Sequence, residues 1–262
     1  MQSPLCDSTI WITGASTGIG KALALELAKR GSILILSART LSTLTEVANQ
    51  INQNGGKAIA LPVDVLQLEK LKEVVAVAER QLSRPIDIHI ACAGNHIKTV
   101  PEKFDSSEYL ELMNTNYGGM LRSFEAVLPS MLRRKKGYLV GIASMVGYRG
   151  MPSAAAYGAS KAAMINFLES IRFHLKNHNI KVTIVNPGFV KTPLTDKNEF
   201  KMPFLTTAER SAKIIADGLE RGKKEISYPV PFNWFIKLLR VLPYALYEKI
   251  VGIMWQKMNR AK

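Results

Sequence analysis

Short apolar stretches rich in β-branched side chains alternate along the chain with amphipathic stretches of helical period. Alternation of this kind predicts parallel strands that are covered on both faces by crossover helices. We expect strands at Thr9–Thr13, Ile33–Ala38, Ala58–Asp64, Ile86–Ala91, Gly137–Ala143, Val182–Asn186 and Glu225–Tyr228. We expect helices at 19–30, 41–53, 67–82, 107–134, 153–177 and 207–221. The pattern therefore predicts an α/β protein with a single Rossmann-type, doubly wound parallel sheet over residues 1–230.

The segment 231–262 departs from this rhythm, because no further strand follows. At helical period, its first apolar side chains form one stripe, which contains Phe232, Phe235, Ile236, Leu239 and Leu242. The opposite side of that helix carries Asn233, Lys237 and Arg240. Pro243 should end that helix, and a second amphipathic piece can hold Leu246, Ile250, Ile253 and Trp255. The pattern predicts a C-terminal amphipathic helical extension.

Two roles for this extension remain open. Six basic side chains against Glu248 give the segment a net charge of +5, which suits an anionic membrane surface. The same apolar side chains can instead cover the core of the domain, frame the substrate entrance or lie between subunits. The sequence favours neither role over the other.

Size and composition fit one globular domain. The chain has 262 residues, of which 47% are hydrophobic, and no apolar run approaches the length that a membrane-spanning helix needs. Its two cysteines, Cys6 and Cys92, lack the spacing of a metal or redox pair, which favours a reducing compartment. The first residues leave no room for a signal peptide before the first strand. We therefore expect a cytoplasmic protein, with peripheral membrane attachment if the extension binds lipid.

The net charge of the chain favours anionic partners but does not distinguish between the kinds of anion. The formal net charge is +14, which attracts anions such as a phosphorylated cofactor, an anionic membrane or a nucleic acid. Signatures of RNA-binding strands are absent, so no nucleic acid is expected. The four histidines show no zinc-like pattern, so no metal is expected either, and His174 and His178 should lie at the surface.

A glycine-rich segment joins the first strand directly to the first helix. It reads Thr13-Gly14-Ala15-Ser16-Thr17-Gly18-Ile19-Gly20. Glycines allow a tight turn and a close approach to a pyrophosphate, whose charge then meets the free N–H groups of the helix. The segment predicts a dinucleotide site, although an ordinary strand-to-helix turn is the alternative.

The end of the second strand indicates which nicotinamide cofactor is bound. Arg39 stands 19 residues beyond Gly20, with the hydroxyls of Ser37 and Thr40 beside it, and no carboxylate is present there. An acid at this point holds the ribose of NAD, whereas an arginine meets the 2′-phosphate of NADP. The sequence predicts NADP(H), although a solvated arginine at a strand end is common.

Three side chains have the spacing of an acid–base group. Tyr157 and Lys161 lie four residues apart on one helix, and Ser144 precedes Tyr157 by 13 residues at the end of a strand. A tyrosine with an ordinary pKa near 10 is a poor acid or base at neutral pH, so a neighbouring ammonium is needed to stabilise its phenolate. In the reductive direction Tyr157 would donate a proton to a carbonyl oxygen that Ser144 also holds.

Together with the glycine turn, this Ser and Tyr-x-x-x-Lys arrangement resembles the short-chain dehydrogenase/reductase family over about residues 8–228. The resemblance implies that Lys161 holds the nicotinamide ribose and that Asn116 completes the catalytic set by holding a water. It further implies cofactor contacts from Asp64, Val65, Ala93, Gly94, Pro187, Gly188, Val190 and Thr192. Asp64 would accept from the adenine amino group, although capping the next helix is an alternative, and Thr192 would bond the carboxamide.

One motif departs from the family pattern. Where many members have Asn-Asn-Ala-Gly, this chain has Ala91-Cys92-Ala93-Gly94. The asparagine side chains that bond neighbouring strands are missing, but Ala93 and Gly94 still allow the cofactor to approach. Cys92 reads as a small buried side chain.

The resemblance implies an enzyme that interconverts a carbonyl and an alcohol, acting as a homo-oligomer, either a dimer or a tetramer. The stretch Phe189–Leu205 is rich in Phe, Met and Pro and should cover the substrate, which favours an apolar, lipid-like carbonyl such as a 3-keto lipid or a steroid. The competing hypothesis is a retired fold of the same family that serves as a basic membrane-surface or nucleic-acid-binding module. The presence of all four catalytic residues favours the enzyme.

Overall fold

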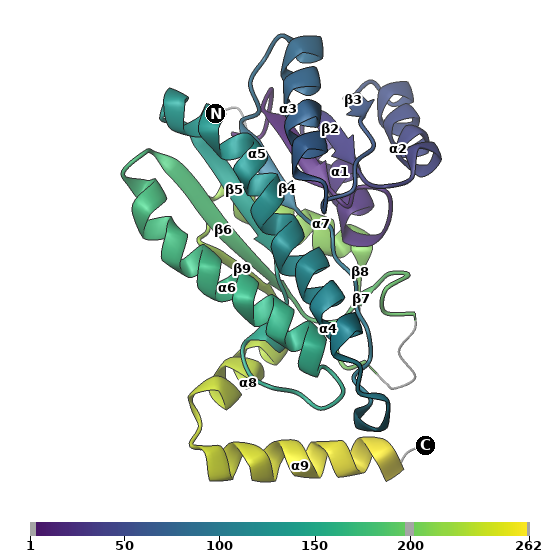
Figure 1. Ribbon diagram of the computed structural model, residues 1–262, viewed down its shortest axis with the longest axis vertical. Coiled ribbons are helices and arrows are strands. Elements are labelled where there is room, and N and C mark those ends of the chain that lie inside the picture. The colour runs from purple at the N-terminus through teal and green to yellow at the C-terminus, as the bar shows by residue number, and fades with distance from the viewer. Residues whose placement is uncertain (1–3, 197–201, 261–262) are drawn as a thin grey trace.

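Seven parallel strands form one sheet in a computed structural model that describes residues 4–196 and 202–260 (Figure 1). The order across the sheet is β3-β2-β1-β4-β5-β6-β9. The strands are β1 (Thr9–Thr13), β2 (Ile33–Ser37), β3 (Lys57–Ala60), β4 (Ile88–Ala91), β5 (Gly137–Ile142), β6 (Ile180–Pro187) and β9 (Glu225–Tyr228). The order reverses between β1 and β4, and ligands of such sheets bind at the carboxyl ends beside that point. The predicted doubly wound α/β fold is confirmed.

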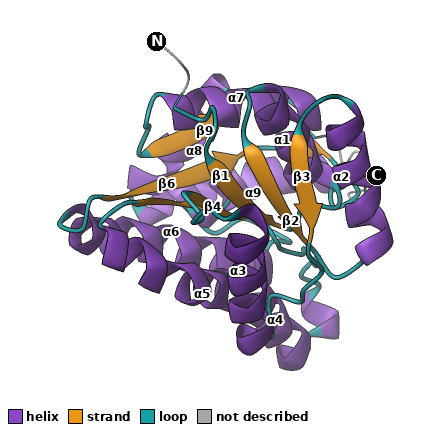
Figure 2. Ribbon diagram, turned by 90° about the horizontal axis from the view of Figure 1, so that it is seen from above, coloured by secondary structure: helices purple, strands orange, loops and turns teal. Residues whose placement is uncertain are grey.

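Helices cover both faces of the sheet (Figure 2). One face packs against α1 (Gly18–Lys29), α2 (Leu41–Gln53) and α7 (Ala208–Glu220). The other packs against α3 (Leu68–Leu82), α5 (Gly119–Arg134) and α6 (Ala155–Lys176). The two apolar cores lie between these layers, which explains why the strands read as continuous apolar runs rather than alternating ones.

The helix predicted over 107–134 is present but not uniform. It consists of α4 (Ser106–Met113), a π-helical turn over Asn114–Gly118, and α5. Asn116 lies in this turn with no exposed surface. Turns of this kind widen a helix and are frequent at functional sites.

The predicted end of the third strand was less accurate. The strand ends at Ala60 rather than Asp64, although the N–H groups of Leu61 and Val63 still bond the carbonyls of Leu36 and Ala38. A short parallel pair that was not predicted, β7 (Val190–Lys191) and β8 (Thr206–Thr207), joins the two ends of the segment expected to cover the substrate, whose residues 197–201 lie outside the described part.

The C-terminal extension forms α8 (Val230–Val241) and α9 (Tyr244–Arg260) at one end of the molecule (Figure 1). The helices are separated at Pro243, as the sequence predicts. Ile236, Leu239 and Val251 are buried in the core that α3, α5 and α6 share, so the predicted apolar stripe covers the domain itself. Among the described residues, no helix combines the length and apolar character needed to cross a membrane.

Candidate active site

The glycine turn is shaped by close backbone approaches at the carboxyl end of β1. Gly14 has φ +72°, and a Cβ there would lie 2.7 Å from the backbone of Ala93. A Cβ on Gly20 would lie 2.1 Å from the carbonyl oxygen of Gly14. Only glycine fits both positions, so the turn folds tightly against the segment after β4.

Helix α1 begins in this turn, and no N-cap side chain bonds the N–H groups of its first turn. Thr17 precedes it without a side-chain cap bond, and its first turn contains no acidic residue. Unsatisfied N–H groups and the positive end of the helix dipole together form an anion site. Ser16, Gly18 and Ile19 lie in the same turn, so its geometry fits a pyrophosphate.

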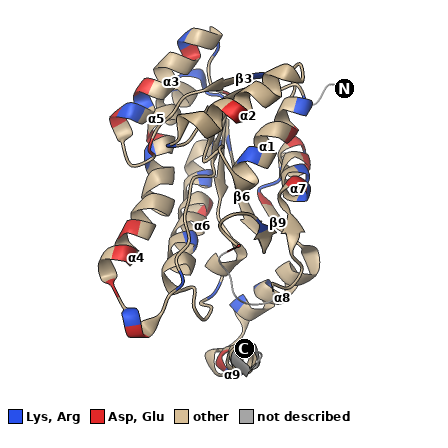
Figure 3. Ribbon diagram, turned by 90° about the vertical axis from the view of Figure 1, so that its right-hand side faces the viewer, with Lys and Arg blue, Asp and Glu red and all other residues tan. Residues whose placement is uncertain are grey.

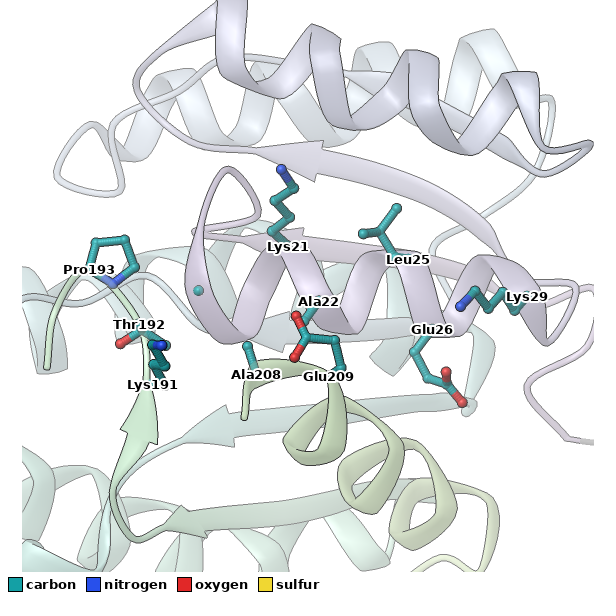
Figure 4. Close-up of a pocket in the computed structure, with 11 residues that line it drawn as sticks. Lys21, Ala22, Leu25, Glu26, Lys29, Lys191, Thr192, Pro193, Ala208 and Glu209 are labelled. Atoms are coloured by element: carbon teal, nitrogen blue, oxygen red, sulfur yellow. The ribbon is translucent and has the colours of Figure 1, made fainter. Parts of the chain in front are cut away.

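Thr192, more than 170 residues further along the chain, lies against this turn. A Cβ on Gly18 would be 3.2 Å from the Thr192 methyl group, and Thr195 Oγ1 accepts from the Thr192 amide at 3.0 Å. A groove of about 330 Å³ runs between α1, the segment Lys191–Pro193 and the start of α7, and Lys21, Lys191 and Glu209 line it (Figure 4). It flanks the glycine turn and does not include Tyr157 or Lys161.

Arg39 follows β2 with an exposed side chain that makes no hydrogen bond or ion pair with any described residue. The two hydroxyls that flank Arg39 in the sequence differ in the structure. Ser37 is fully buried, and its hydroxyl accepts from Trp11 Nε1 at 3.0 Å and donates to the Leu61 carbonyl at 2.8 Å. The Ser37 hydroxyl therefore stabilises the sheet and is not free for a phosphate, whereas Thr40 is exposed at the start of α2.

Asp64 and Val65 lie in the loop between β3 and α3. The Asp64 carboxylate accepts from the Leu66 amide at 2.9 Å, which shapes the turn before α3, whereas the residue at the helix cap is Gln67. Val65 is buried, and its side chain packs so closely on Gly119 that a Cβ there would lie 2.6 Å from it.

Tyr157, Lys161 and Ser144 converge beyond the carboxyl ends of β4 to β6. Tyr157 and Lys161 lie on the first turns of α6, with the Lys161 Nζ 5.7 Å from the centroid of the Tyr157 ring. Lys161 is only 5% exposed, and its Nζ donates to the carbonyl of Ile142 at 2.8 Å. Ser144 follows β5, and its hydroxyl lies 3.5 Å from the carbonyl oxygen of Pro187.

Burial perturbs both titrating groups in opposite directions. It raises the pKa of Tyr157 to about 12, while a hydrogen bond with Ser144 acts in the lowering direction. Burial lowers the pKa of Lys161 to about 8, because the ammonium loses its contact with water. At neutral pH the site therefore holds a protonated phenol next to a destabilised ammonium, which suits proton donation.

Asn116 connects the catalytic helix to the loop after β4. Its Nδ2 donates to the Asn95 carbonyl at 3.0 Å and to Ser160 Oγ at 2.9 Å, and its Oδ1 accepts from the Asn95 amide at 2.7 Å. A Cβ on Gly94 would lie 3.1 Å from that oxygen and 3.6 Å from the Lys161 Nζ. Asn116 therefore holds Gly94 close to Lys161.

The motif after β6 brings backbone to the same place. Pro187 ends β6, Gly188 donates its N–H to the Tyr228 carbonyl at 2.8 Å, and Val190 is buried in β7. The predicted catalytic and cofactor residues thus all lie beyond the carboxyl ends of the parallel strands, with Arg39 after β2 and Tyr157 beyond β4 to β6.

Three residues near the site were not among the predicted site residues. The His96 ring packs edge-on against Tyr157 with centroids 4.9 Å apart. Cys92 lies in the field of Lys161, although burial raises its thiol pKa to about 11 and keeps it protonated. Tyr148, four residues after Ser144, donates to the Glu225 carboxylate, which Lys237 of α8 also contacts at 2.6 Å. Only the fold brings these residues to the catalytic group.

Two of the remaining histidines lie at the surface, as predicted, and one is buried. His174 and His178 are exposed, and His89 is buried against Trp11, where desolvation lowers its pKa to about 3. Within residues 4–196 and 202–260, no group of three or more His, Cys, Asp or Glu side chains is placed to hold a metal ion.

The fold and this arrangement at the switch point define the class of Rossmann-type oxidoreductases. A family model described as short chain dehydrogenase matches residues 8–202. The chain therefore belongs to the short-chain dehydrogenase family, as its motifs predicted.

Related sequences agree with this assignment. An uncharacterized oxidoreductase of Myxococcus xanthus is 34% identical over 240 residues, covering 92% of this chain and 94% of that protein. The ketoacyl reductase HetN of Nostoc sp. is 31% identical over 229 residues, covering 86% of this chain and 79% of its own.

Solved structures are similar as well. A variant of actinorhodin polyketide ketoreductase with NADPH has a TM-score of 0.77 at 25% identity, covering 87% of this chain and 97% of that one. An alcohol dehydrogenase from Thermococcus sibiricus complexed with 5-hydroxy-NADP has a TM-score of 0.75 at 25% identity, covering 84% and 95%. The chain is thus an oxidoreductase of short-chain dehydrogenase type.

Proposed function

We propose that this protein is an NADP(H)-dependent reductase that interconverts an apolar ketone or aldehyde and the corresponding alcohol. The observation that carries the proposal is the meeting of Ser144, Tyr157 and Lys161 at the end of the sheet where the glycine turn and Thr192 also lie. A catalytically inactive member of the family would gain nothing from a buried, destabilised ammonium beside a tyrosine.

The choice of NADP(H) is supported by Arg39. Its guanidinium is exposed beyond β2 and pairs with none of the described residues, and a planar guanidinium can make two charge-assisted bonds to one phosphate. The names of two similar structures include NADPH and an NADP analogue.

The reaction follows from the residues around Tyr157. The bound cofactor supplies the hydride. Tyr157 is protonated at neutral pH and donates its proton to the carbonyl oxygen, while the Ser144 hydroxyl donates a hydrogen bond to the same oxygen. Lys161 stabilises the phenolate that remains, and Asn116 keeps the loop after β4 in contact with α6.

An apolar substrate is supported by an aromatic cluster beside the site. The Phe189 and Phe232 rings stack with centroids 5.9 Å apart, and the Phe204 ring lies 6.2 Å from that of Phe232. These three rings come from the segment that follows β6 and from α8, so they form a wall next to Gly188. A wall of this kind binds acyl chains or steroid rings better than sugars. Two similar proteins are described as a ketoacyl reductase and a polyketide ketoreductase.

The cofactor is tested by steady-state kinetics with NADPH and NADH. NADPH should be preferred at least tenfold in kcat/KM, which corresponds to about 1.4 kcal/mol. Arg39→Asp should erase or reverse this preference because a carboxylate repels the 2′-phosphate, whereas Arg30→Lys, a change in a basic residue paired with acids on α1 and α7, should leave it intact. Equal use of both cofactors by the unchanged protein would contradict the proposal.

The substrate class and assembly need separate measurements. NADPH oxidation should be faster with 3-keto lipids or steroids than with short polar aldehydes, and Phe232→Ala should reduce this difference. If NADPH were oxidised with none of the carbonyls in such a panel, the result would favour the alternative of a catalytically inactive member of the family. We also propose a homo-oligomer, supported by exposed Leu110 and Phe173 on α4 and α6, which sedimentation velocity tests.

A further inference from the structure

Helix α8 has two apolar faces, of which the sequence pattern predicted only one. The inner face is the stripe that contains Ile236 and Leu239 and is buried. The opposite side carries a second apolar set, which we call the α8 outer face. Its side chains and their exposed fractions are Val230 (60%), Trp234 (70%), Leu238 (55%) and Val241 (75%).

The spacing of these four residues places them on one side of the helix, since residues four and three apart are neighbours on a helical surface. Tyr244 (74% exposed) and Leu246 (47% exposed) extend exposed apolar surface onto the start of α9. Single exposed apolar side chains are normal, but four on one side of the same helix mark an interaction surface.

Charge identifies the kind of partner. Arg240 on α8 and Lys249 on α9 are exposed, although the Arg240 guanidinium also lies 5.7 Å from the centroid of the Tyr148 ring, and Lys and Arg positions on α8 are visible in Figure 3. Glu248 is the one acidic residue between positions 226 and 262, and the whole chain carries +14. Two copies meeting through this face would bring their basic side chains together, which costs free energy. An anionic surface would instead be attracted.

The outer face belongs to the folded domain rather than to a loose tail. Lys237 of α8 pairs with Glu225 of β9 at 2.6 Å. The Arg149 guanidinium lies 4.6 Å and 4.3 Å from the ring centroids of Tyr244 and Tyr247, and its Nη1 donates to the Arg240 carbonyl at 2.9 Å. These contacts hold α8 and α9 to the loop that follows Ser144. The apolar side chains are therefore presented to solvent by a fixed helix.

We propose that the α8 outer face docks onto an anionic phospholipid bilayer. Val230, Trp234, Leu238 and Val241 enter the boundary between headgroups and acyl chains, and Arg240 and Lys249 contact the headgroup phosphates. A helix with aromatic and aliphatic side chains on one face and basic residues at its margin lies in the plane of such a surface. Docking needs no conformational change, because the face already points to solvent.

This docking has a consequence for the reaction that rests on the proposed function. Phe232 on the inner side of α8 belongs to the aromatic wall of the substrate region, so one helix, about 10 Å across, separates that wall from the outer face. A docked protein therefore holds its substrate region at the bilayer surface, where a lipid-like carbonyl can be reached without passing through water.

The experiment is co-sedimentation of the full chain with vesicles of phosphatidylcholine alone or of phosphatidylcholine and phosphatidylglycerol in a 7:3 ratio, at low and high salt. We expect binding to the anionic vesicles that weakens with salt. Trp234→Ser and Leu238→Ser should each reduce binding at least fivefold. Leu41→Ser removes a leucine of similar exposure, 52%, from α2 and serves as the matched control that should bind normally.

Tryptophan emission gives a second readout. In a Trp255→Phe background, the remaining tryptophans are the fully buried Trp11 and the exposed Trp234. Anionic vesicles should shift the emission to shorter wavelength, because only Trp234 can move from water into lipid. Neutral vesicles at the same concentration should not.

Three results would overturn the proposal. The first is full recovery of the protein in the supernatant at low salt, and the second is equal binding to both kinds of vesicle. The third is that Leu238→Ser changes the oligomeric state of the protein but leaves its vesicle binding unaffected. The last result would make the face an interface between copies. NADPH oxidation with a water-soluble ketone is measured in the same samples without vesicles and should be unchanged in Leu238→Ser. Loss of docking and loss of the reductase reaction are therefore distinguished.

Discussion

Replacing Lys161 by methionine should make the protein more stable while abolishing its activity. The ammonium is 5% exposed, and no carboxylate compensates its charge among the described residues. Its pKa falls from 10.5 to about 8, and this difference corresponds to about 3 kcal/mol of free energy that the folded state loses at neutral pH. Methionine keeps an unbranched apolar side chain of similar length next to Met164.

Part of that gain is lost with the hydrogen bond from the Lys161 Nζ to the Ile142 carbonyl, which contributes about 1 to 2 kcal/mol. The net expectation is that Lys161→Met raises the free energy of unfolding by about 1 to 2 kcal/mol at pH 7. Chemical denaturation followed by circular dichroism measures it. Lys176→Met, an exposed position on the same helix, is the control and should change stability by less than about 0.5 kcal/mol.

The pH dependence gives the sharper test. Because the folded pKa of Lys161 lies below the unfolded value, the unfolded chain binds more protons between pH 8 and 10.5. The penalty is complete below that window and disappears as pH rises through it, so the advantage of the variant should shrink by about 1 kcal/mol between pH 7 and pH 9. A variant that is less stable than the unchanged protein, with the same pH dependence, would refute this account of the buried ammonium.

Three further changes test the site and the C-terminal helices. Tyr157→Phe keeps the ring but removes the acid, so kcat should fall roughly 10²- to 10⁴-fold while cofactor binding, measured by fluorescence titration, persists. Gly20→Ala places a methyl group 2.1 Å from a backbone oxygen of the glycine turn and should cost about 1–3 kcal/mol of stability, whereas Gly252→Ala on α9, with open space around it, should cost nothing in a thermal melt. Arg149→Ala removes a guanidinium from between two tyrosine rings and should cost about 1–3 kcal/mol, with faster proteolysis after residue 241. An unchanged kcat in Tyr157→Phe, or an unchanged stability in Gly20→Ala or Arg149→Ala, would contradict the role given to that residue.

The local pattern of the chain was enough to predict the sheet, because buried parallel strands and amphipathic helices differ in period and length. The seven predicted strands all exist, and the glycine turn lies between β1 and α1 as expected. The predicted strand ends were less accurate where backbone hydrogen bonds continue past the strand, as they do after Ala60. The π-helical turn around Asn116 had no signal either, and within it Asn116 bonds Asn95 and Ser160, residues that are distant in sequence.

The sequence by itself determined the family and predicted the catalytic group, because Ser144, Tyr157, Lys161 and the glycine turn are recognisable from residue type and spacing. Only the tertiary structure decided which side chains were available. The Ser37 hydroxyl stands close to Arg39 in the sequence but is buried in the sheet, and His96, which gave no sequence signal, packs on Tyr157. In α8 the stripe that looked suited to lipid covers the core, while Trp234 and Leu238 on its other side face solvent. The physical reason is that a helical period shows which residues share a face, whereas burial depends on what the rest of the chain places against that face.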